Sequence, residues 1–259
     1  MNKEKSGVIR KVQDFKGSTK LKRIINHAIE SKRFNHAKKI VDIGCGLGEQ
    51  LYLVNQLIPS ASVINCDIDP EIIKLGKKKY PDIEFKLQSA DDIDFDDKSV
   101  DIIICSNLIE HVNNPEKVLS EIQRVLKDDG LLLIDFPNGY CMGELIFRWG
   151  GKFLHGKSSH LKAFTYSGAI NLLQKNNLYI NEEIHCLGYG PYIHHSIYKT
   201  LFRSKHKGIS SLINQIFFKL KIKYKVEFLI SKIPHDNKIT NKYVHYYNID
   251  EPYKISKVE

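Results

Sequence analysis

The amino-acid sequence predicts an α/β protein with a doubly wound, mostly parallel sheet. From about residue 38, short β-branched runs alternate with segments that have the apolar spacing of helices, which is typical of βαβ units. The first of these predicted strands runs directly into a glycine-rich turn, "IGCGLGE". The chain of 259 residues is 42% hydrophobic, which is enough to fill the core of one large α/β domain.

Seven segments are predicted to be strands because they are rich in β-branched or apolar residues and are bounded by turn residues. They are residues 38–43, 61–67, 83–87, 100–106, 131–137, 178–186 and 241–249. The fourth of them, "VDIIICS", is apolar almost throughout, as a strand covered by helices on both faces should be.

Helical spacing and end signals predict helices between these strands, at residues 49–58, 71–79 and 166–175 and in the segment 113–130. Asp69 is placed as an N-cap with Pro70 at the first helical position, and Asn114 and Pro115 repeat this start signal. Gly130 is predicted to close the helix that Asn114 begins. The apolar stripe of that helix consists of Val118, Leu119, Ile122, Val125 and Leu126.

The net charge of +9 is unevenly distributed along the chain. Residues 1–39 carry 12 Lys and Arg against 3 acids, residues 40–189 carry 14 against 22, and residues 190–243 carry 11 against 2. An acidic body flanked by two basic segments argues against a uniformly basic nucleic-acid-binding protein. We therefore expect no nucleic acid as a partner.

Residues 1–37 are predicted to form a basic helical lid, and residues 38–259 one domain with a basic helical insertion at about 190–236. Within the insertion, residues 199–232 combine lysines with apolar and aromatic residues, a composition that suits either contact with an anionic membrane or a helical cap with solvated lysines. No apolar run is long enough for a membrane span, and no secretory leader is evident. We expect a cytoplasmic protein, with peripheral contact at the inner membrane face as the open alternative.

The five cysteines are odd in number, widely spaced and free of any CxxC pair. They are Cys45, Cys66, Cys105, Cys141 and Cys186. This pattern predicts buried, reduced thiols rather than disulfides. No HExxH motif or Cys/His grouping is present in the sequence, so no metal site is expected.

The glycine turn indicates a nucleotide-like cofactor, and its details distinguish between two classes. Dinucleotide-binding turns usually read G-x-G-x-x-G and hold a pyrophosphate, whereas the glycines here read G-x-G-x-G. Asp42, two residues before Gly44, would repel a pyrophosphate but attract an ammonium group. S-adenosylmethionine carries that ammonium together with a sulfonium cation and has no phosphate. We therefore predict that Asp42 and the turn residues bind S-adenosylmethionine; the turn residues are Gly44, Cys45, Gly46 and Gly48.

A second acid is expected at the end of the second strand, where it can accept hydrogen bonds from ribose hydroxyls. Asp67 occupies this position, and the neighbouring Ile68 is predicted to be an apolar wall for the adenine. Because dinucleotide-binding proteins also place an acid here, Asp67 indicates nucleoside binding without choosing between the two cofactors.

At this point the sequence resembles the class I S-adenosylmethionine-dependent methyltransferases, and in particular the small-molecule branch that includes ubiquinone-type O-methyltransferases. The resemblance extends over about residues 38–187. It depends on the motifs "VDIGCGLGEQL", "VINCDIDPEII" and "SADDIDFDDKSVDIIICSNLIEHVNNPEKVLSEIQRVLKDDGLLLIDFPN", and more loosely on "HLKAFTYSGAINLLQKNNLYI". It implies a Rossmann-like sheet of seven strands, mostly parallel with an antiparallel last strand, and helices on both faces.

The resemblance also implies that the stretch containing Ser89 and Ala90 binds the adenine edge. Many relatives have an aspartate where this chain has Ser89, so either the serine hydroxyl or Asp91 is expected to accept a hydrogen bond from the adenine amino group.

The end of the fourth strand is predicted to face the reacting methyl group. Ser106 and Asn107 lie there, beside the topological switch point at which open sheets bind ligands, and both are expected to contact the cofactor. His111 follows four residues after Asn107, and its imidazole could take a proton from a hydroxyl during methyl transfer. The alternative is that His111 only holds its loop by hydrogen bonding.

The sequence therefore predicts a methyltransferase that uses S-adenosylmethionine to methylate an oxygen or nitrogen of a small or lipid-linked molecule. Two alternatives remain: a non-catalytic scaffold of the same fold, and a nicotinamide-dependent dehydrogenase. The sequence specifies neither the acceptor nor the oligomeric state.

Overall fold

The computed structural model describes residues 34–137, 161–162, 164–187, 223–231, 243–248 and 251–257. Its helical elements are η1 (Phe34–His36), α3 (Glu49–Leu57), α4 (Pro70–Lys79), η2 (Ile109–His111), α5 (Pro115–Val125) and α7 (Tyr166–Lys175). Its strands are β1 (Lys39–Ile43), β2 (Ser62–Asp67), β3 (Glu84–Leu87), β4 (Val100–Cys105), β5 (Leu126–Pro137), β6 (Tyr179–Leu187), β7 (Lys223–Ser231), β8 (Tyr243–Asn248) and β9 (Glu251–Lys257).

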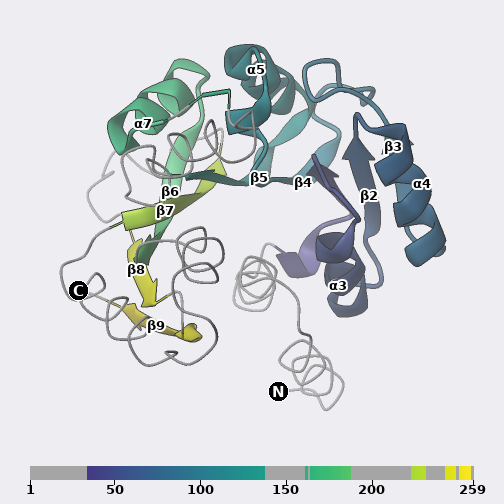
Figure 1. The fold of residues 1–259 in the computed structure, drawn as a ribbon, viewed down its shortest axis with the longest axis horizontal. Helices are drawn as coiled ribbons and strands as arrows, with labels where there is room; N and C mark the ends of the chain where they lie inside the picture. The colour runs from purple at the N-terminus through teal and green to yellow at the C-terminus, as the bar shows by residue number, and fades with distance from the viewer. Residues whose placement is uncertain are drawn as a thin grey trace, which may run out of the picture.

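One sheet holds all these strands in the order β3-β2-β1-β4-β5-β7-β6-β8-β9 (Figure 1). The five strands from β3 to β5 are parallel to one another. The strand order reverses direction along the chain between β1 and β4, so the topological switch point lies there. The predicted α/β class with a mostly parallel Rossmann-like sheet is confirmed.

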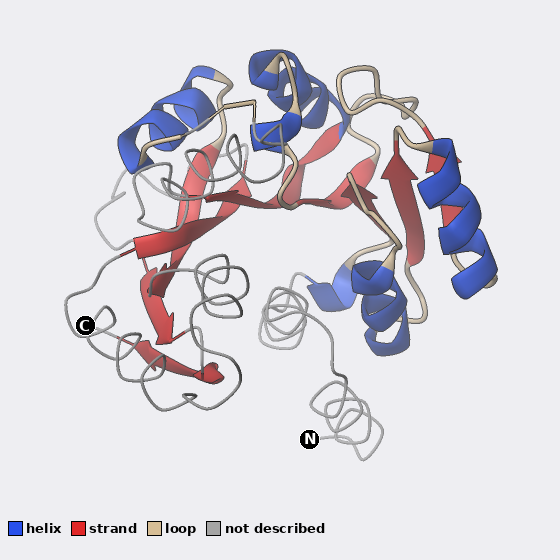
Figure 2. Ribbon diagram, in the orientation of Figure 1, coloured by secondary structure: helices blue, strands red, loops and turns tan. Residues whose placement is uncertain are grey.

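The central strands are apolar because helices cover both faces of the sheet, as Figure 2 shows. One face packs against α5 and α7, and it consists of Val41, Ile43, Ile103, Cys105, Leu132 and Ile134. The opposite face packs against α3, and it consists of Ile40, Ile102, Ile104, Leu131 and Leu133. This alternation also fixes which polar residues near the strand ends share a face.

The predicted helix starts are confirmed. The Asp69 carboxylate accepts from the N–H groups of Glu71 and Ile72, and the Asn114 side chain accepts from the N–H of Lys117. Because Pro70 and Pro115 occupy the first helical positions, these helices lose no hydrogen bond at their prolines.

The predicted end of α5 is wrong. The helix ends at Val125, and Leu126 is already extended and pairs with Val100 as the first residue of β5. Gly130 is not a helix cap, because its φ is not positive. A Cβ on Gly130 would lie 2.8 Å from the Leu126 side chain, so close packing rather than helix termination requires glycine there.

Two further predictions about the second half of the chain are corrected. Within the described residues the sheet has nine strands rather than seven, with β7 antiparallel to both β5 and β6, β8 parallel to β6, and β9 antiparallel to β8. The predicted insertion at 190–236 is not helical throughout, because residues 223–231 form β7 in the middle of the sheet. Alternating lysines and apolar residues suggested an amphipathic surface segment, but the period of two belongs to a strand.

Several predictions fall outside the described residues. They are the helix of the N-terminal lid, the loop 138–160, and the insertion residues 190–222 and 232–236. Among the described helices, none has both the length and the apolar character that crossing a bilayer requires.

Candidate active site

The turn between β1 and α3 is built from its backbone. Gly44, Gly46 and Gly48 have φ values of 71°, 55° and 78°, in the left-handed region that favours glycine. The N–H groups of Gly44 and Cys45 both donate to the carbonyl oxygen of Cys66 in β2, at 2.8 and 3.0 Å. The turn is therefore attached to the carboxyl end of the neighbouring strand.

Two of the glycines serve different purposes. A Cβ on Gly48 would lie 2.5 Å from the Phe85 ring and 2.7 Å from Asn65 Nδ2, so the absence of a side chain lets α3 approach the sheet. A Cβ on Gly46 would meet nothing within 4 Å. Gly46 therefore faces open space against which a ligand can lie, as expected of a cofactor cradle.

Asp67 lies against this open part of the turn. Its Oδ2 atom accepts from the N–H of Gly46 at 3.1 Å, and its Oδ1 atom accepts from the N–H of Asp69 at 3.0 Å. The next side chain, Ile68, is 70% exposed. The structure thus brings the predicted sugar-binding acid, the predicted adenine wall and the glycine turn together at one edge of the sheet.

Asp42 is fully buried in β1, level with Asn65 in β2. Burial, followed by the negative charges of Asp42 and Asp67, raises the pKa of the Cys45 thiol above its ordinary value. Burial also raises the pKa of Cys66 to about 12, with a smaller contribution from Asp42, although a hydrogen bond from Gln88 acts in the opposite direction. The turn therefore lies in a negative potential, which suits a cationic ligand and opposes a pyrophosphate. Direct contact between Asp42 and an ammonium group stays a prediction.

Cys45, Cys66 and Cys105 are buried thiols outside any disulfide, as the sequence predicted for these three. Their burial and the raised pKa values of Cys45 and Cys66 keep those two thiols protonated at neutral pH.

Two buried amide side chains near the glycine turn were not predicted. Asn65 is fully buried, and neither its Oδ1 nor its Nδ2 atom has a hydrogen-bond partner among the described residues. The Oε1 atom of the buried Gln50, in the first turn of α3, also has none there. Buried amides of this kind commonly bind internal water. The available signal was Asn65 as a polar residue inside the apolar run "VINC".

The predicted adenine-edge residues follow β3. Ser89 Oγ donates to Asp91 Oδ1 at 2.5 Å, so the two candidates for the adenine amino group form one unit. Ala90 is partly buried against the core.

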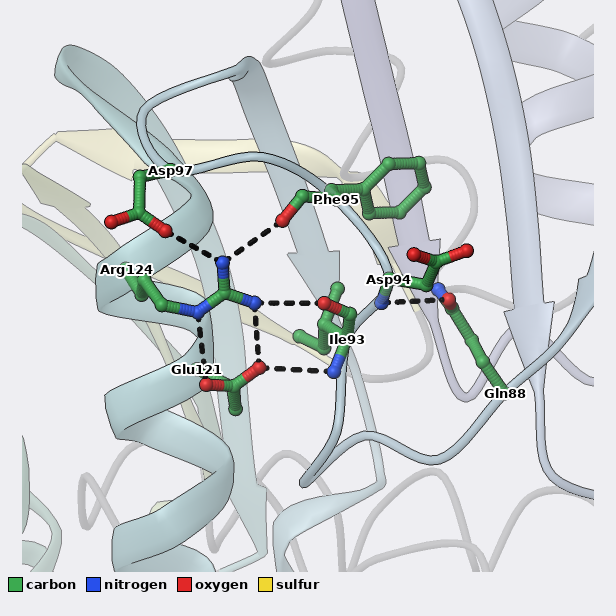
Figure 3. A network of polar contacts seen from close by, with 7 residues as sticks. All are labelled: Gln88, Ile93, Asp94, Phe95, Asp97, Glu121 and Arg124. Carbon is green, nitrogen blue, oxygen red and sulfur yellow. Dashed lines mark hydrogen bonds and ion pairs between the residues drawn. The ribbon is translucent and has the colours of Figure 1, made fainter.

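The loop after this unit is held to α5 by Arg124 (Figure 3). The guanidinium of Arg124 donates to the carbonyl oxygens of Ile93 and Phe95 and to the carboxylates of Asp97 and Glu121. Glu121 Oε2 also accepts from the N–H of Ile93 at 3.0 Å. The hydrogen bonds from Arg124, which outweigh partial burial, lower the pKa of Glu121.

The turn after β4 is fixed by a buried carboxylate that the sequence prediction did not include. Asp135 in β5 accepts a short hydrogen bond from Ser106 Oγ at its Oδ2 atom, and its Oδ1 atom accepts from the N–H of Asn107 at 2.7 Å. Asn107 has a φ of 50°, a conformation that asparagine tolerates better than most residues. Ser106 and Asp135 are 5% and 3% exposed.

His111 ends the short helix η2, which follows this turn. Its Nε2 atom lies 4.0 Å from Glu110 Oε1, and its side chain is 34% exposed, whereas Glu110 is buried. The carbonyl oxygen of Glu110 accepts from the N–H groups of Leu161 and Lys162, at 2.8 and 3.1 Å. A solvent-accessible imidazole on a firmly held turn is compatible with both roles predicted for His111.

The two turns pack against each other. A Cβ on Gly44 would lie 2.9 Å from the Leu108 side chain, so the glycine turn and the β4–η2 turn are in close contact. The glycine turn therefore adjoins the turn that leads to His111, at the carboxyl ends of β1 and β4. In the part of the chain that the structure describes, no group of three or more His, Cys, Asp or Glu side chains could hold a metal ion.

Residues 41–134 match the family model described as "Methyltransferase domain". The chain is 34% identical over 101 residues to the ubiquinone/menaquinone biosynthesis C-methyltransferase UbiE of Campylobacter jejuni, a match that covers 37% of this chain and 43% of that protein. It is 33% identical over 99 residues to the demethylmenaquinone methyltransferase of Chlorobaculum tepidum, covering 38% and 40%. The matches thus span less than half the length of these relatives.

Solved structures show the same fold at low sequence identity. An O-methyltransferase from a polyketide synthase of Brevibacillus brevis, solved with S-adenosyl-L-homocysteine, aligns with a TM-score of 0.56 at 19% identity, over 83% of this chain and 72% of that one. The geranyl diphosphate C-methyltransferase of Streptomyces coelicolor A3(2) aligns with a TM-score of 0.57 at 12% identity, over 83% and 80%.

Residues 41–134, which include the glycine turn, match a methyltransferase domain, and the described strands form a Rossmann-like sheet around it. The resemblance to class I S-adenosylmethionine-dependent methyltransferases is confirmed, and the domain is similar to those of ubiquinone and menaquinone methyltransferases.

Proposed function

We propose that this protein transfers a methyl group from S-adenosylmethionine to a small or lipid-linked acceptor. The observation that carries the proposal is the open space at Gly46, bordered by Asp67 and lying in the negative potential of Asp42 and Asp67. A positively charged nucleoside without phosphates is complementary to such a site.

In this proposal S-adenosylmethionine, when bound, supplies the activated methyl group, and the chain supplies binding, orientation and exclusion of water. Asp67 accepts hydrogen bonds from the ribose, and Ile68 covers the adenine. The Ser89–Asp91 unit accepts a hydrogen bond from the adenine amino group. His111, one-third exposed beside the β4–η2 turn, is the candidate base for an acceptor hydroxyl or amine.

Calorimetric titration tests cofactor choice directly. S-adenosylhomocysteine should bind, and NAD should not, because its pyrophosphate would meet the negative potential at the turn. Tighter binding of NAD would favour the dehydrogenase alternative and contradict the proposal.

We further propose that the acceptor atom is an oxygen or a nitrogen, as the sequence resemblance implies. A carbon acceptor is the second candidate, because the names of the Campylobacter and Streptomyces relatives specify C-methyltransferases. Incubating the protein with cell extract and methyl-labelled S-adenosylmethionine, followed by tandem mass spectrometry that locates the added methyl group in the product, separates the two. A protein that binds the cofactor but labels no product would support the scaffold alternative.

Peripheral membrane contact is proposed only for residues 199–222 of the predicted 199–232 segment, since β7 occupies residues 223–231 within the sheet. Co-sedimentation with anionic vesicles at low salt should deplete the soluble fraction. A soluble fraction unchanged by lipid would leave the cytoplasm as the expected location.

A further inference from the structure

Asp135 and Ser106 lie level with the first glycine of the turn. The register pairs Ile43 of β1 with Cys105 of β4, and Cys105 with Ile134 of β5. The next residue of each strand is therefore Gly44, Ser106 and Asp135, in a row across the carboxyl edge of the sheet. Because neighbouring strands lie about 4.8 Å apart, the backbones of Gly44 and Asp135 are separated by roughly 10 Å.

The same row lies on one face of the sheet. Ile104 and Leu133, two residues before Ser106 and Asp135, both belong to the core beneath α3. Asp42 precedes Gly44 by two residues and is level with Ile104. Three carboxylates thus border this region: Asp42 and Asp67 on the side of β1 and β2, and Asp135 on the side of β4 and β5.

The Ser106–Asp135 hydrogen bond determines what Ser106 can offer a ligand. Because the hydroxyl hydrogen is donated to Asp135, Ser106 Oγ can act only as an acceptor toward a ligand. Asp135 also holds the N–H of Asn107, so the turn that carries Ser106 cannot reorient freely. An acceptor oxygen backed by a buried carboxylate is complementary to a positive charge and to the polarised methyl C–H groups of a sulfonium.

We infer that the Ser106–Asp135 pair selects for the positive charge of the methyl donor. The inference rests on the proposed function and adds to it a means of distinguishing donor from product. Methyl transfer removes the methyl group from sulfur and leaves a neutral thioether, so the attraction disappears once the reaction is complete. Ser106 touches the ligand, and Asp135 is a positioning residue that acts through it.

The test compares two ligands that differ in charge at the sulfur position. S-adenosylhomocysteine is neutral there, whereas sinefungin carries an amine that is protonated at neutral pH. We expect Asp135→Asn to weaken sinefungin binding about tenfold relative to S-adenosylhomocysteine, as loss of one nearby, partly screened charge predicts. Ser106→Ala should weaken sinefungin binding about threefold relative to S-adenosylhomocysteine, because the Asp135 carboxylate remains but the acceptor oxygen of Ser106 is lost. Both dissociation constants are measured by calorimetry for each variant.

Asp128→Asn is the matched control, because Asp128 lies on the same strand but is exposed at its other end, where it pairs with Lys98. Asp128→Asn should leave the ratio of the sinefungin and S-adenosylhomocysteine dissociation constants unchanged. Equal weakening of both ligands by Asp135→Asn would indicate a purely structural role and overturn the inference, as would an unchanged ratio. If Asp135→Asn does not fold, as judged by circular dichroism, Ser106→Ala alone decides. Wild-type protein that binds neither ligand would instead overturn the proposed function itself.

Discussion

The turn after β1 and the turn after β4 solve the same problem in different ways. Each must reverse the chain sharply at the carboxyl end of a buried parallel strand. The β1–α3 turn does so by leaving out side chains and bonding its backbone to Cys66, with Gly46 and Gly48 at positive φ. The β4–η2 turn keeps its side chains, places Asn107 at positive φ, and depends on the carboxylate of Asp135 to hold it.

The comparison teaches that a turn built from glycines is visible in the sequence, whereas a turn held by a distant side chain is not. Asp135 lies 28 residues after Asn107 in the chain, within the otherwise apolar stretch "LLLIDF" of β5. The same difference predicts how each half of the site should fail. Substitutions that add side-chain atoms should impair the glycine turn, whereas substitutions that change side-chain chemistry should impair the β4–η2 side.

The largest effect is expected on the β4–η2 side. If His111 is the base, His111→Ala should lower methyl-transfer turnover on extract by about 100-fold or more, while binding of S-adenosylhomocysteine stays nearly unchanged. The exposed His36 supplies the control variant His36→Ala, which should retain full turnover. A loss of less than fivefold for His111→Ala would assign the histidine a structural role.

Gly48→Ala should break the glycine turn as a structural element. The new methyl group would be forced against Phe85 and Asn65 at a φ of 78°, so we expect the free energy of unfolding to fall by about 2–3 kcal/mol. Urea denaturation measures this change. Unaltered stability would mean that α3 can move away from the sheet without cost.

Gly46→Ala sharpens the comparison within the same turn. Its methyl group would project into open space, so stability should fall by only about 1 kcal/mol from backbone strain. Binding of S-adenosylhomocysteine should weaken about tenfold, because the methyl group occupies the ligand's position. Gly48→Ala serves as the control for the stability component. Unchanged affinity for Gly46→Ala would show that the cofactor does not lie against this residue.

The smallest effect concerns acid sensitivity. The lowered pKa of Glu121 means that its contribution to stability is present above its ordinary value of 4.5 and is lost as the pH falls through the lower folded value. Hydrogen exchange at the Ile93 amide, which donates to Glu121, should therefore lose protection as the pH falls from 4.5 through the lower folded pKa, whereas the Gly44 amide, bonded to Cys66, should not.

Glu121→Gln should cost about 1 kcal/mol at neutral pH and remove the acid dependence at Ile93. Glu116→Gln, at an exposed glutamate on the same helix, is the control and should leave both unchanged. Parallel loss of protection at Ile93 and Gly44 in the wild type would indicate global unfolding and contradict the local explanation.

Prediction from the sequence succeeded where local chemistry decides structure. The N-caps Asp69 and Asn114 and the prolines after them fixed two helix starts, and apolar runs fixed the five parallel strands. It failed for β7, because a strand that lies between β5 and β6 gains its hydrogen bonds from residues far away in the chain. It also failed at Gly130, where contact with Leu126 rather than a helix end requires the glycine.

The sequence by itself determined the class of domain. The glycine turn is one contiguous stretch of sequence, and the acids near it lie at the ends of predicted strands. Only the tertiary structure decided that Gly46 faces open space while Gly48 packs on Phe85, and that Asp135 joins Ser106 and Asn107. The physical reason is that strand register, which aligns residues distant in the chain, depends on the packing of the whole sheet rather than on any local preference.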